Sequence, residues 1–451
     1  MTPALRVADL SPFAPRDKKQ AGYDEAAWLD RLQRHLRGSE HVIRLGDAMS
    51  EDEDHVISRD AAGQWQAGRY IGELVFEGRR LEIYPRLGLD VIGRWLEGAL
   101  NLVAVPETAE QQASESFIAL LMAAIWCRQV DVAARHGPPA FRHDVTHEGF
   151  FVRGRLDVRQ TARLRGRASP HVASVMRPRE LRNDVSRTLV AAERVLTQAV
   201  GHDRWRTARV REILPQLYPA VGARPRLPSL TDLRRIRYTP ITRPFKQAAE
   251  LSWRIARHEG FGANAEPGTV EGLLLDVAEL WELFLLSCVR AAAPMLRVEH
   301  GTAGGEAFLL TSKRDPDRGL GRLKPDILVW EGDRLRAVID AKYKRLVDRR
   351  PDRPQGVDRG DLYQLTSYLA ALDVEGAIVG MLLYPRDPEQ TSTATGEAYG
   401  PWLLGSGSEV RFQRVAVTPE GAIADVAELL GIAVKRGPTA LSDPPAGVPT
   451  S

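Results

Sequence analysis

The chain has 451 residues, more than a single hydrophobic core usually supports, so we expect two or three domains. Apolar residues make up 43% of it, charged residues 27%, and the net charge is only +3, which excludes general disorder. The longest apolar run, residues 117–127, is too short to span a membrane, and the sequence has no export signal and no cysteine framework for disulfides or zinc. We therefore expect a soluble cytoplasmic protein with no membrane partner.

The N-terminal part of the sequence predicts a small sheet. Residues 1–24 are rich in proline and charge, and we expect them to be disordered or loosely ordered. Residues 25–105 are predicted to form a β-rich module with a helix at 26–38 and strands at 41–45, 65–78 and 79–88. The segment Glu77–Arg80 is a candidate tight turn between the last two strands, which favours a small antiparallel sheet or barrel.

Residues 106–250 are predicted to be mostly helical and carry a strong positive charge. Helices are predicted at 113–135 and 183–201, with a strand at 151–158 between them. Residues 151–250 contain 22 Lys and Arg but only 8 Asp and Glu. Such an excess is typical of a surface that faces nucleic acid or an acidic partner, although solvated helix faces would give the same pattern.

The C-terminal part of the sequence predicts an α/β domain with a mixed central sheet over residues 251–434, followed by a disordered tail at 435–451. The predicted order is helix, two strands of a hairpin, helix and two further strands. The corresponding ranges are 273–294, 323–330, 334–344, 361–372, 377–385 and 410–417.

Three charged residues at one end of the predicted hairpin indicate a metal-dependent site. Asp326 precedes the first strand in a Lys-Pro-Asp segment, and Asp340 and Lys342 lie two positions apart in the second. Residues two apart on a strand share a face, so Asp340 and Lys342 project together and Asp326 can meet them. Two carboxylates on a rigid frame suit Mg²⁺, which would polarise a phosphate and activate a bound water. The ammonium of Lys342 would orient that water or neutralise charge on phosphorus.

This pattern of Pro-Asp followed by Asp-x-Lys across a hairpin resembles the PD-(D/E)xK nuclease superfamily. Glu282 lies in the preceding apolar helix, where that superfamily often has a further metal ligand, although Glu279 one turn earlier is a competitor. Gln364 and Tyr368 resemble the Gln-x-x-x-Tyr element of RecB-like nucleases, although ordinary helix packing would also explain them. The resemblance implies a Mg²⁺ site, with Mn²⁺ as a substitute, held by Asp326, Asp340 and Glu282.

Three segments point to one family within this superfamily. They are DVAELWELF at 276–284, IDAKYK at 339–344 and YQLTSY at 363–368. They look like McrC, the nuclease subunit of McrBC-type restriction systems, and its LlaJI-like relatives. The segment at 70–88 is similar as well, except that Arg86 replaces the usual Lys. In that family the C-terminal domain cuts DNA with Mg²⁺, and the N-terminal half docks into a ring of the AAA+ GTPase McrB and stimulates it. The resemblance therefore implies DNA and a McrB-like ring as partners, with 106–250 as the docking region.

The sequence is consistent with nucleotide hydrolysis by a separate partner, because it contains no Gly-Lys dipeptide and therefore no Walker A loop. Any motor activity must come from a partner. Two alternatives stay open. The chain could be a self-sufficient PD-(D/E)xK nuclease of DNA repair or phage defence, or a non-cleaving adaptor of an AAA+ ring.

Overall fold

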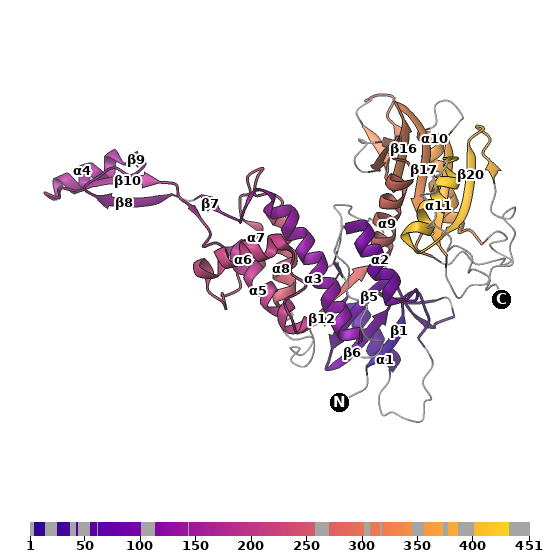
Figure 1. Ribbon diagram of the computed structural model, residues 1–451, viewed down its shortest axis with the longest axis horizontal. Helices are drawn as coiled ribbons and strands as arrows, with labels where there is room; N and C mark the ends of the chain where they lie inside the picture. Colours follow the sequence, from indigo (N-terminus) through magenta and orange to yellow (C-terminus); the bar gives the residue numbers. More distant parts are fainter. Residues whose placement is uncertain are drawn as a thin grey trace, which may run out of the picture. The chain divides into compact units, whose positions relative to one another are not determined.

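Figure 1 shows the chain in a computed structural model, which describes residues 4–13, 25–36, 42–43, 55–60, 62–100, 113–142, 144–257, 270–301, 307–315, 318–344, 356–372, 378–386 and 401–432. The chain forms two compact units. The first contains most of the chain up to Asp276, and the second contains Asp90–Asn101 and the chain from Val277 onward. Both units combine helices with sheets, which confirms a mixed α/β protein. The domain boundaries expected from the sequence stay predictions, and the tail at 435–451 and most of 1–24 lie outside the described residues.

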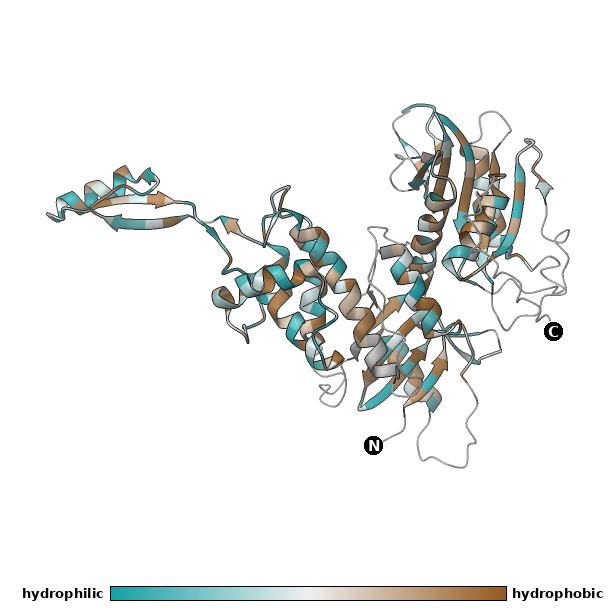
Figure 2. Cartoon of the chain, viewed as in Figure 1, coloured by the Kyte–Doolittle hydropathy of each residue, from teal (hydrophilic) through white to brown (hydrophobic). Residues whose placement is uncertain are grey.

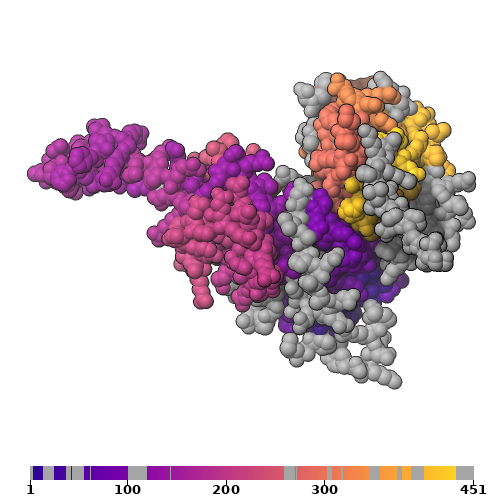
Figure 3. All heavy atoms as spheres, viewed as in Figure 1, coloured from indigo at the N-terminus to yellow at the C-terminus, as the bar shows by residue number. Residues whose placement is uncertain are grey.

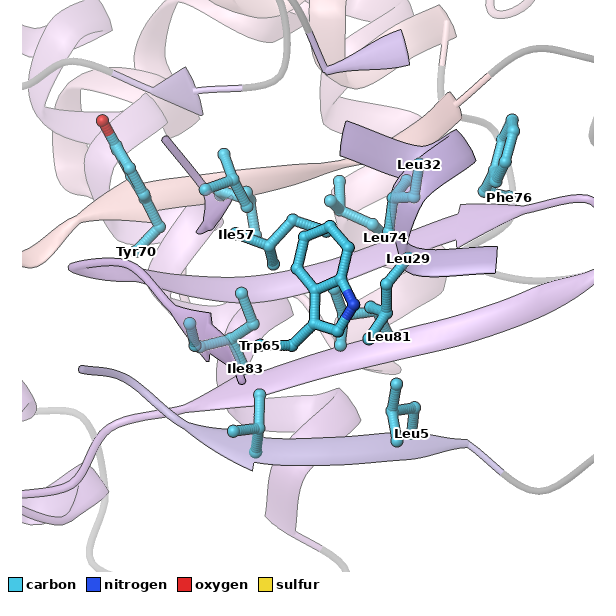
Figure 4. Close-up of a cluster of buried hydrophobic side chains, with 14 of the residues drawn as sticks. Leu5, Leu29, Leu32, Ile57, Trp65, Tyr70, Leu74, Phe76, Leu81 and Ile83 are labelled. Atoms are coloured by element: carbon cyan, nitrogen blue, oxygen red, sulfur yellow. The ribbon is translucent and has the colours of Figure 1, made fainter. Parts of the chain in front are cut away.

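The first unit is built on a five-stranded sheet. Its strands, in order across the sheet, are β1 (Leu5–Ala8), β6 (Arg79–Tyr84), β5 (Tyr70–Phe76), β12 (Val270–Asp276) and β2 (Val42–Ile43). Helix α1 (Glu25–His35) and the paired strands β3 (Ile57–Arg59) and β4 (Trp65–Ala67) contribute to the same core. Figure 4 shows this core, in which Leu29, Leu74, Leu81 and Ile83 are almost completely buried. The predicted helix at 26–38 is confirmed.

The sheet is mixed rather than antiparallel. β5 and β6 do form an antiparallel hairpin, and Glu77 and Gly78 have φ values of 49° and 71° as in a type I′ turn, so the predicted tight turn is confirmed. However, β1 is parallel to β6 and β2 is parallel to β12. The prediction of an antiparallel sheet or barrel is therefore wrong. The alternation of apolar residues marks a strand, but it does not show which distant strand becomes its neighbour.

Three element boundaries differ from the predicted ones. Residues 270–276 form strand β12 instead of the start of a helix, because a fully apolar run suits a buried central strand as well as a buried helix. The predicted strand at 65–78 is two strands that break at Gly68, whose backbone lies so close to His55 that an added Cβ would be 2.3 Å from its carbonyl oxygen. Helix α2 (Leu89–Leu100) follows the sheet where only strands were expected.

Several other helices of the first unit form a bundle around α5. The helices of this bundle are α3 (Ala113–Ala133), η2 (Ala134–His136), α5 (Asp184–Val200), α6 (Ala208–Val221), α7 (Leu230–Arg234) and α8 (Phe245–Arg257). α5 packs against both α3 and α8. The Asn183 side chain accepts a hydrogen bond from the Ser186 amide at the start of α5, and Gly201 ends the helix in the left-handed conformation. The helices predicted at 113–135 and 183–201 are confirmed.

A small module interrupts these helices. It consists of β8 (Val145–Gly149), β9 (Arg155–Leu156), α4 (Val158–Gly166) and β10 (Val172–Met176), and the pair β7 (Phe141–Arg142) and β11 (Arg179–Glu180) joins it to the helices. Figure 3 shows a narrow body, and few of its side chains, such as Leu164 and Ala173, are buried. The predicted strand at 151–158 is wrong except for Arg155–Leu156. Asp157 caps α4 instead, with its carboxylate accepting a hydrogen bond from the Gln160 amide.

The second unit contains a six-stranded sheet in the order β13 (Arg297–His300), β16 (Ile327–Glu331), β17 (Arg334–Ala341), β18 (Val379–Pro385), β20 (Glu409–Val415) and β19 (Trp402–Leu403). β17, β18 and β20 are parallel, and the other pairings are antiparallel. The central strands β17 and β18 are mostly apolar (Figure 2). The predicted mixed sheet, the hairpin and the strands near 377–385 and 410–417 are confirmed.

Helices cover both faces of this sheet. Helix α10 (Arg359–Leu372) packs Leu365 and Leu369 against Val338 and Leu382. Helix α9 (Val277–Ala292) contacts β17 on the opposite face of the sheet, to which the alternate residues of the strand point. Helix α11 (Pro419–Leu429) packs beside α9. None of the described helices has the length and apolar content that crossing a bilayer requires.

Helix α2 belongs to this second unit although it precedes most of the first unit in the chain. Its Trp95 stacks against Trp281 and Phe284 of α9, with ring centroids 4.8 and 5.4 Å away. The Trp95 indole also donates a hydrogen bond of 2.9 Å to the Val417 carbonyl oxygen. Trp95 is completely buried.

Strands β5 and β12 approach each other closely because each has a glycine in the left-handed region. An added Cβ on Gly272, at φ +122°, would lie 2.1 Å from the Glu73 carbonyl oxygen, and one on Gly72, at φ +141°, would lie 2.3 Å from that of Leu273. We therefore expect Gly272→Ala to lower the free energy of unfolding by about 3 kcal/mol, through backbone strain and a clash with rigid backbone.

Urea denaturation measures this loss. Gly93→Ala in α2 is the matched control, because nothing lies within 4 Å of its added Cβ, and it should leave stability unchanged or slightly increased. Equal stability of Gly272→Ala and the wild type would contradict the close approach of β5 and β12.

Candidate active site

Strands β16 and β17 bring two carboxylates to the same end of the second sheet. Asp326 immediately precedes β16 and Asp340 lies near the end of β17, and the register that pairs Ile327 with Ile339 brings the two aspartates opposite each other. The Asp326 carboxylate accepts a hydrogen bond of 2.6 Å from the Ala341 amide, which ties the two strands together at this point. The structure therefore brings together the two aspartates that the sequence singled out.

Lys342 lies beside them, directly after β17. Its backbone amide donates to the Leu383 carbonyl oxygen, which continues the pairing with β18 and fixes the direction of the side chain. The Lys342 ammonium lies 2.6 Å from the Asp340 carboxylate and donates a hydrogen bond of 2.8 Å to the Gln364 side-chain oxygen. Asp340 is almost completely buried, so this ammonium supplies the positive charge that such a carboxylate requires.

Gln364 and Tyr368 extend the same network along α10. The Gln364 amide donates to the Tyr368 hydroxyl over 2.8 Å, and that hydroxyl donates to the Lys324 carbonyl oxygen over 3.0 Å. The chain of hydrogen bonds therefore runs from Lys342 through α10 to the residue two positions before Asp326. Tyr368 is also part of the core of this unit, so helix packing accounts for its burial, and the role of this motif in supporting the site stays a prediction.

Asp361 is a member of the site that the sequence analysis missed. It is buried in the first turn of α10, where its carboxylate accepts a hydrogen bond of 2.8 Å from Lys344 and lies 3.9 Å from the Lys342 ammonium. Its spacing from Gln364 and Tyr368 could have identified Asp361 from the sequence, because residues at i, i+3 and i+7 lie on one face of a helix. Asp361 gives Lys342 a second negative partner besides Asp340.

Glu282 enters the site from α9. Its carboxylate lies 2.5 Å from His300 Nε2 at the end of β13, and both side chains are largely buried. This hydrogen bond raises the pKa of His300. The amide of Gly301, next along the chain, donates to the Asp326 carbonyl oxygen. Glu282 is thus held beside the segment that carries Asp326, and its charge acts on both aspartates.

The electrostatics of the site show an excess of negative charge. Burial raises the pKa of Asp326 well above its usual value, and the charges of Glu282 and Asp340 raise it further. Burial also raises the pKa of Asp340, although the Lys342 ammonium opposes this effect. Burial alone would lower the pKa of Lys342, but the surrounding aspartates outweigh burial, and the pKa of Lys342 is raised. Lys342 therefore stays an ammonium at neutral pH.

This set of donors fits a hard divalent cation. Carboxylate oxygens are the ligands that Mg²⁺ prefers, and Mg²⁺ is usually held by one or two carboxylates together with water and phosphate. Among the residues that the structure describes, no three His, Cys, Asp or Glu side chains are gathered closely enough to hold a metal ion unaided. Two buried carboxylates whose pKa values are raised by burial and by neighbouring negative charges would nevertheless be stabilised by a cation between them.

The chain is similar to a known protein family and to chains of known structure. Residues 65–385 match the family model described as McrBC 5-methylcytosine restriction system component. No curated protein matches the chain significantly. A refined half-complex from a tetradecameric assembly of Thermococcus gammatolerans McrB AAA+ hexamers with bound McrC contains a chain with 16% identity and a TM-score of 0.53, over 94% of this chain and 99% of that one. A cryo-EM structure of the Thermococcus gammatolerans McrBC complex matches with 15% identity and a TM-score of 0.37, over 64% and 88%. The first of these likenesses indicates a shared fold.

Because the carboxylates of the site repel each other, neutralising one of them should stabilise the protein without metal. We expect Asp326→Asn to raise the free energy of unfolding by about 1 kcal/mol at neutral pH, since the Asn oxygen can still accept the hydrogen bond from Ala341. The pKa of Asp326 is higher in the folded than in the unfolded chain, so the wild type gains stability as the pH falls through the folded pKa. The difference between variant and wild type should therefore disappear at acidic pH.

Thermal unfolding in EDTA at a series of pH values measures this effect. Asp333→Asn, in the exposed turn between β16 and β17, removes the same charge outside the site and should change little. A destabilised Asp326→Asn variant at neutral pH would contradict the repulsion inferred here.

Proposed function

This chain belongs to the family of McrBC 5-methylcytosine restriction system components, and we propose that it is the McrC-like subunit of such a system, which cleaves DNA by Mg²⁺-dependent hydrolysis of a phosphodiester bond. The observation that carries this proposal is the convergence of Asp326, Asp340 and Lys342 at one end of β16 and β17. An antiparallel hairpin with Asp326 before it, Asp340 and Lys342 at its end and Gln364 on the next helix fits the PD-(D/E)xK nuclease fold.

Each residue of the site has a role that follows from its position. Asp326 and Asp340 would hold Mg²⁺, with Mn²⁺ as a substitute, and Glu282 would complete or support the site from α9. When bound, the metal would polarise the scissile phosphate and lower the pKa of a coordinated water. Gln364 and Tyr368 would keep Lys342 directed at the reacting phosphate through their hydrogen-bonded chain.

Lys342 acts as a cation in this proposal and not as a base. Its pKa is raised by the surrounding aspartates, so it holds its proton at neutral pH and can only donate hydrogen bonds. A fixed ammonium can orient the attacking water or stabilise the negative charge that develops on the phosphate. If Asp340 held a metal ion, Asp361 and Gln364 would remain as partners of the Lys342 ammonium.

We further propose that the chain works with a McrB-like AAA+ GTPase ring, which supplies DNA recognition and movement. The absence of a Gly-Lys dipeptide leaves this chain without a P-loop of its own, and a similar solved chain comes from an assembly of McrB AAA+ hexamers with bound McrC. The cleavage site would then lie in the second unit and the docking surface in the basic region at 106–250.

The small module of β8, β9, β10 and α4 is the best candidate for the docking surface. Phe150, Phe151 and Val158 are 68%, 79% and 71% exposed, and arginines surround them in the sequence. Exposed aromatic and apolar side chains next to arginines are typical of protein interfaces, since their burial supplies binding free energy. A module with so few buried residues gains little stability from these side chains when it is alone.

Two alternative functions differ from this proposal in measurable ways. A self-sufficient nuclease of repair or phage defence would cut DNA with Mg²⁺ and no partner. A non-cleaving adaptor would not cut under any condition. The raised pKa values of Asp326 and Asp340 argue against the adaptor, because repelling buried charges are costly to keep in a site without a function.

Replacing Asp340 by Ala should abolish cleavage, because it removes a metal ligand and the main partner of Lys342. We expect at least a thousandfold loss of DNA cleavage in the presence of Mg²⁺, GTP and the McrB-like partner, whereas stimulation of the GTPase should persist. Gel assays of a DNA substrate and phosphate-release assays measure the two activities on the same protein. Lys435→Ala, which removes a charge from the C-terminal region, is the control. Cleavage by Asp340→Ala at the wild-type rate would contradict the assignment of the site.

The docking surface is tested separately. The double substitution Phe151→Ser and Val158→Ser should reduce the partner's stimulated GTP hydrolysis about tenfold, because it removes apolar contact area from the interface. Val132→Ser, at another exposed apolar position of the first unit, is the matched control and should leave stimulation unchanged. If the double variant stimulates the GTPase like the wild type, the module does not dock the ring.

A further inference from the structure

Strands β14 (Ala307–Thr311) and β15 (Gly319–Leu323) form a two-stranded hairpin that directly precedes the candidate site. Only Lys324 and Pro325 separate the end of β15 from Asp326. The Lys324 carbonyl oxygen accepts the hydrogen bond from Tyr368, so the base of the hairpin is part of the network that supports Lys342. The hairpin is not part of the six-stranded sheet.

Burial falls steadily from the base of this hairpin to its tip. Leu323, paired with Ala307, is buried in the core against α10, but Leu309 is 45% exposed. Leu310 and Leu320, a directly opposed cross-strand pair, are 61% and 62% exposed. Isolated two-stranded hairpins are marginally stable, and one whose outer part exposes leucines on one face has surface available for a ligand.

The tip of the hairpin, residues 312–318, carries three cations and two aspartates, a net charge of +1. The segment from residue 307 to 324 contains five Lys and Arg but two Asp. Lys313, Arg314 and Arg318 are exposed around the turn. Within the described part of the chain, none of these three side chains forms an ion pair with a carboxylate. A surface of cations and leucines suits a polyanion with apolar sugar faces, which is the chemistry of duplex DNA.

We propose that the β14–β15 hairpin is a DNA-binding element that holds the duplex beside the scissile phosphate, with Lys313, Arg314 and Arg318 on the phosphates and Leu310 and Leu320 against the sugars. This inference rests on the proposed nuclease function and assigns the substrate contact that the carboxylate site itself cannot make, because Asp326, Asp340 and Glu282 repel a polyanion.

The dimensions of the hairpin agree with this role. A strand of five residues spans about 17 Å, at about 3.4 Å per residue. Phosphates follow one another along a DNA strand at about 3.4 Å of helix axis. A hairpin lying along the duplex axis would therefore reach phosphates about five nucleotides from the one at Asp326. Contacts at that distance would position the duplex without blocking the reacting bond.

Salt-dependent binding of DNA tests the charges of the hairpin. The full-length protein is titrated in EDTA, which prevents cleavage, against a short fluorescein-labelled duplex at a series of salt concentrations, with anisotropy as the readout. Each lost phosphate contact lowers the slope of log K against log salt by about 0.9, so K313A/R314A/R318A should reduce the slope by about 2 to 3. The matched control R290A/R297A/R334A removes three positive charges elsewhere in the second unit and should leave the slope close to that of the wild type.

The leucines are tested in the same assay. L310A/L320A should weaken binding about fivefold and leave the salt slope unchanged, since apolar contacts release no counterions. Unchanged far-UV circular dichroism and melting temperature show that both variants are folded, as expected for exposed positions.

The possible outcomes distinguish failure of the hairpin inference from failure of the proposed nuclease function. If the wild type binds DNA and the hairpin triple variant keeps the full salt slope, or loses no more than the control triple variant, the hairpin does not contact DNA, while the nuclease proposal stands. If the wild type does not bind DNA at any salt concentration, the hairpin inference is overturned, whereas the nuclease proposal is decided separately by the cleavage assay with the partner. A reduced slope in the hairpin variant alone supports both.

Discussion

The ion pair between Asp340 and Lys342 is the interaction on which the candidate site depends. A carboxylate with 1% exposure cannot remain charged without a cation nearby, and Lys342 supplies one two residues further on, directly after β17. The hydrogen bond from the Lys342 amide to the Leu383 carbonyl oxygen extends the pairing of the sheet to Lys342 and so holds its ammonium beside Asp340. The hydrogen bonds of Gln364 and Tyr368 connect to Asp340 only because Lys342 lies at this position.

The site is a local concentration of negative charge on a strongly apolar frame. Val338 and Leu382 pack against α10 on the face from which Asp340 projects, so the sheet and helix cannot move apart to let water solvate the carboxylates. The surrounding core therefore stabilises an arrangement that is unfavourable by itself. Such a conflict between local electrostatics and global packing is typical of sites that bind a cation or a substrate.

The sequence predicts which residues converge at this site better than it predicts the surrounding structure. Asp326, Asp340 and Lys342 could be found because strand periodicity and a short turn determine which side chains share a face. Asp361, the β14–β15 hairpin and the parallel pairing of β1 with β6 were missed or wrong, since each depends on contacts between distant segments. The helix expected at 273–294 begins four residues late because Leu273 to Leu275 form the end of a central strand, and an apolar run has no period that distinguishes the two. The roles of the site residues stay predictions.

Helix α2 has a consequence for how this chain could be divided or recombined. The indole of Trp95 fills the space between Trp281, Phe284 and the Val417 carbonyl oxygen, yet the rest of the first unit separates α2 from those residues in the chain. A fragment that starts at Val277 would lack this aromatic ring and expose two large apolar side chains to water. Exchange of the C-terminal unit between relatives therefore cannot proceed through one crossover, because the inserted helix must be exchanged with it.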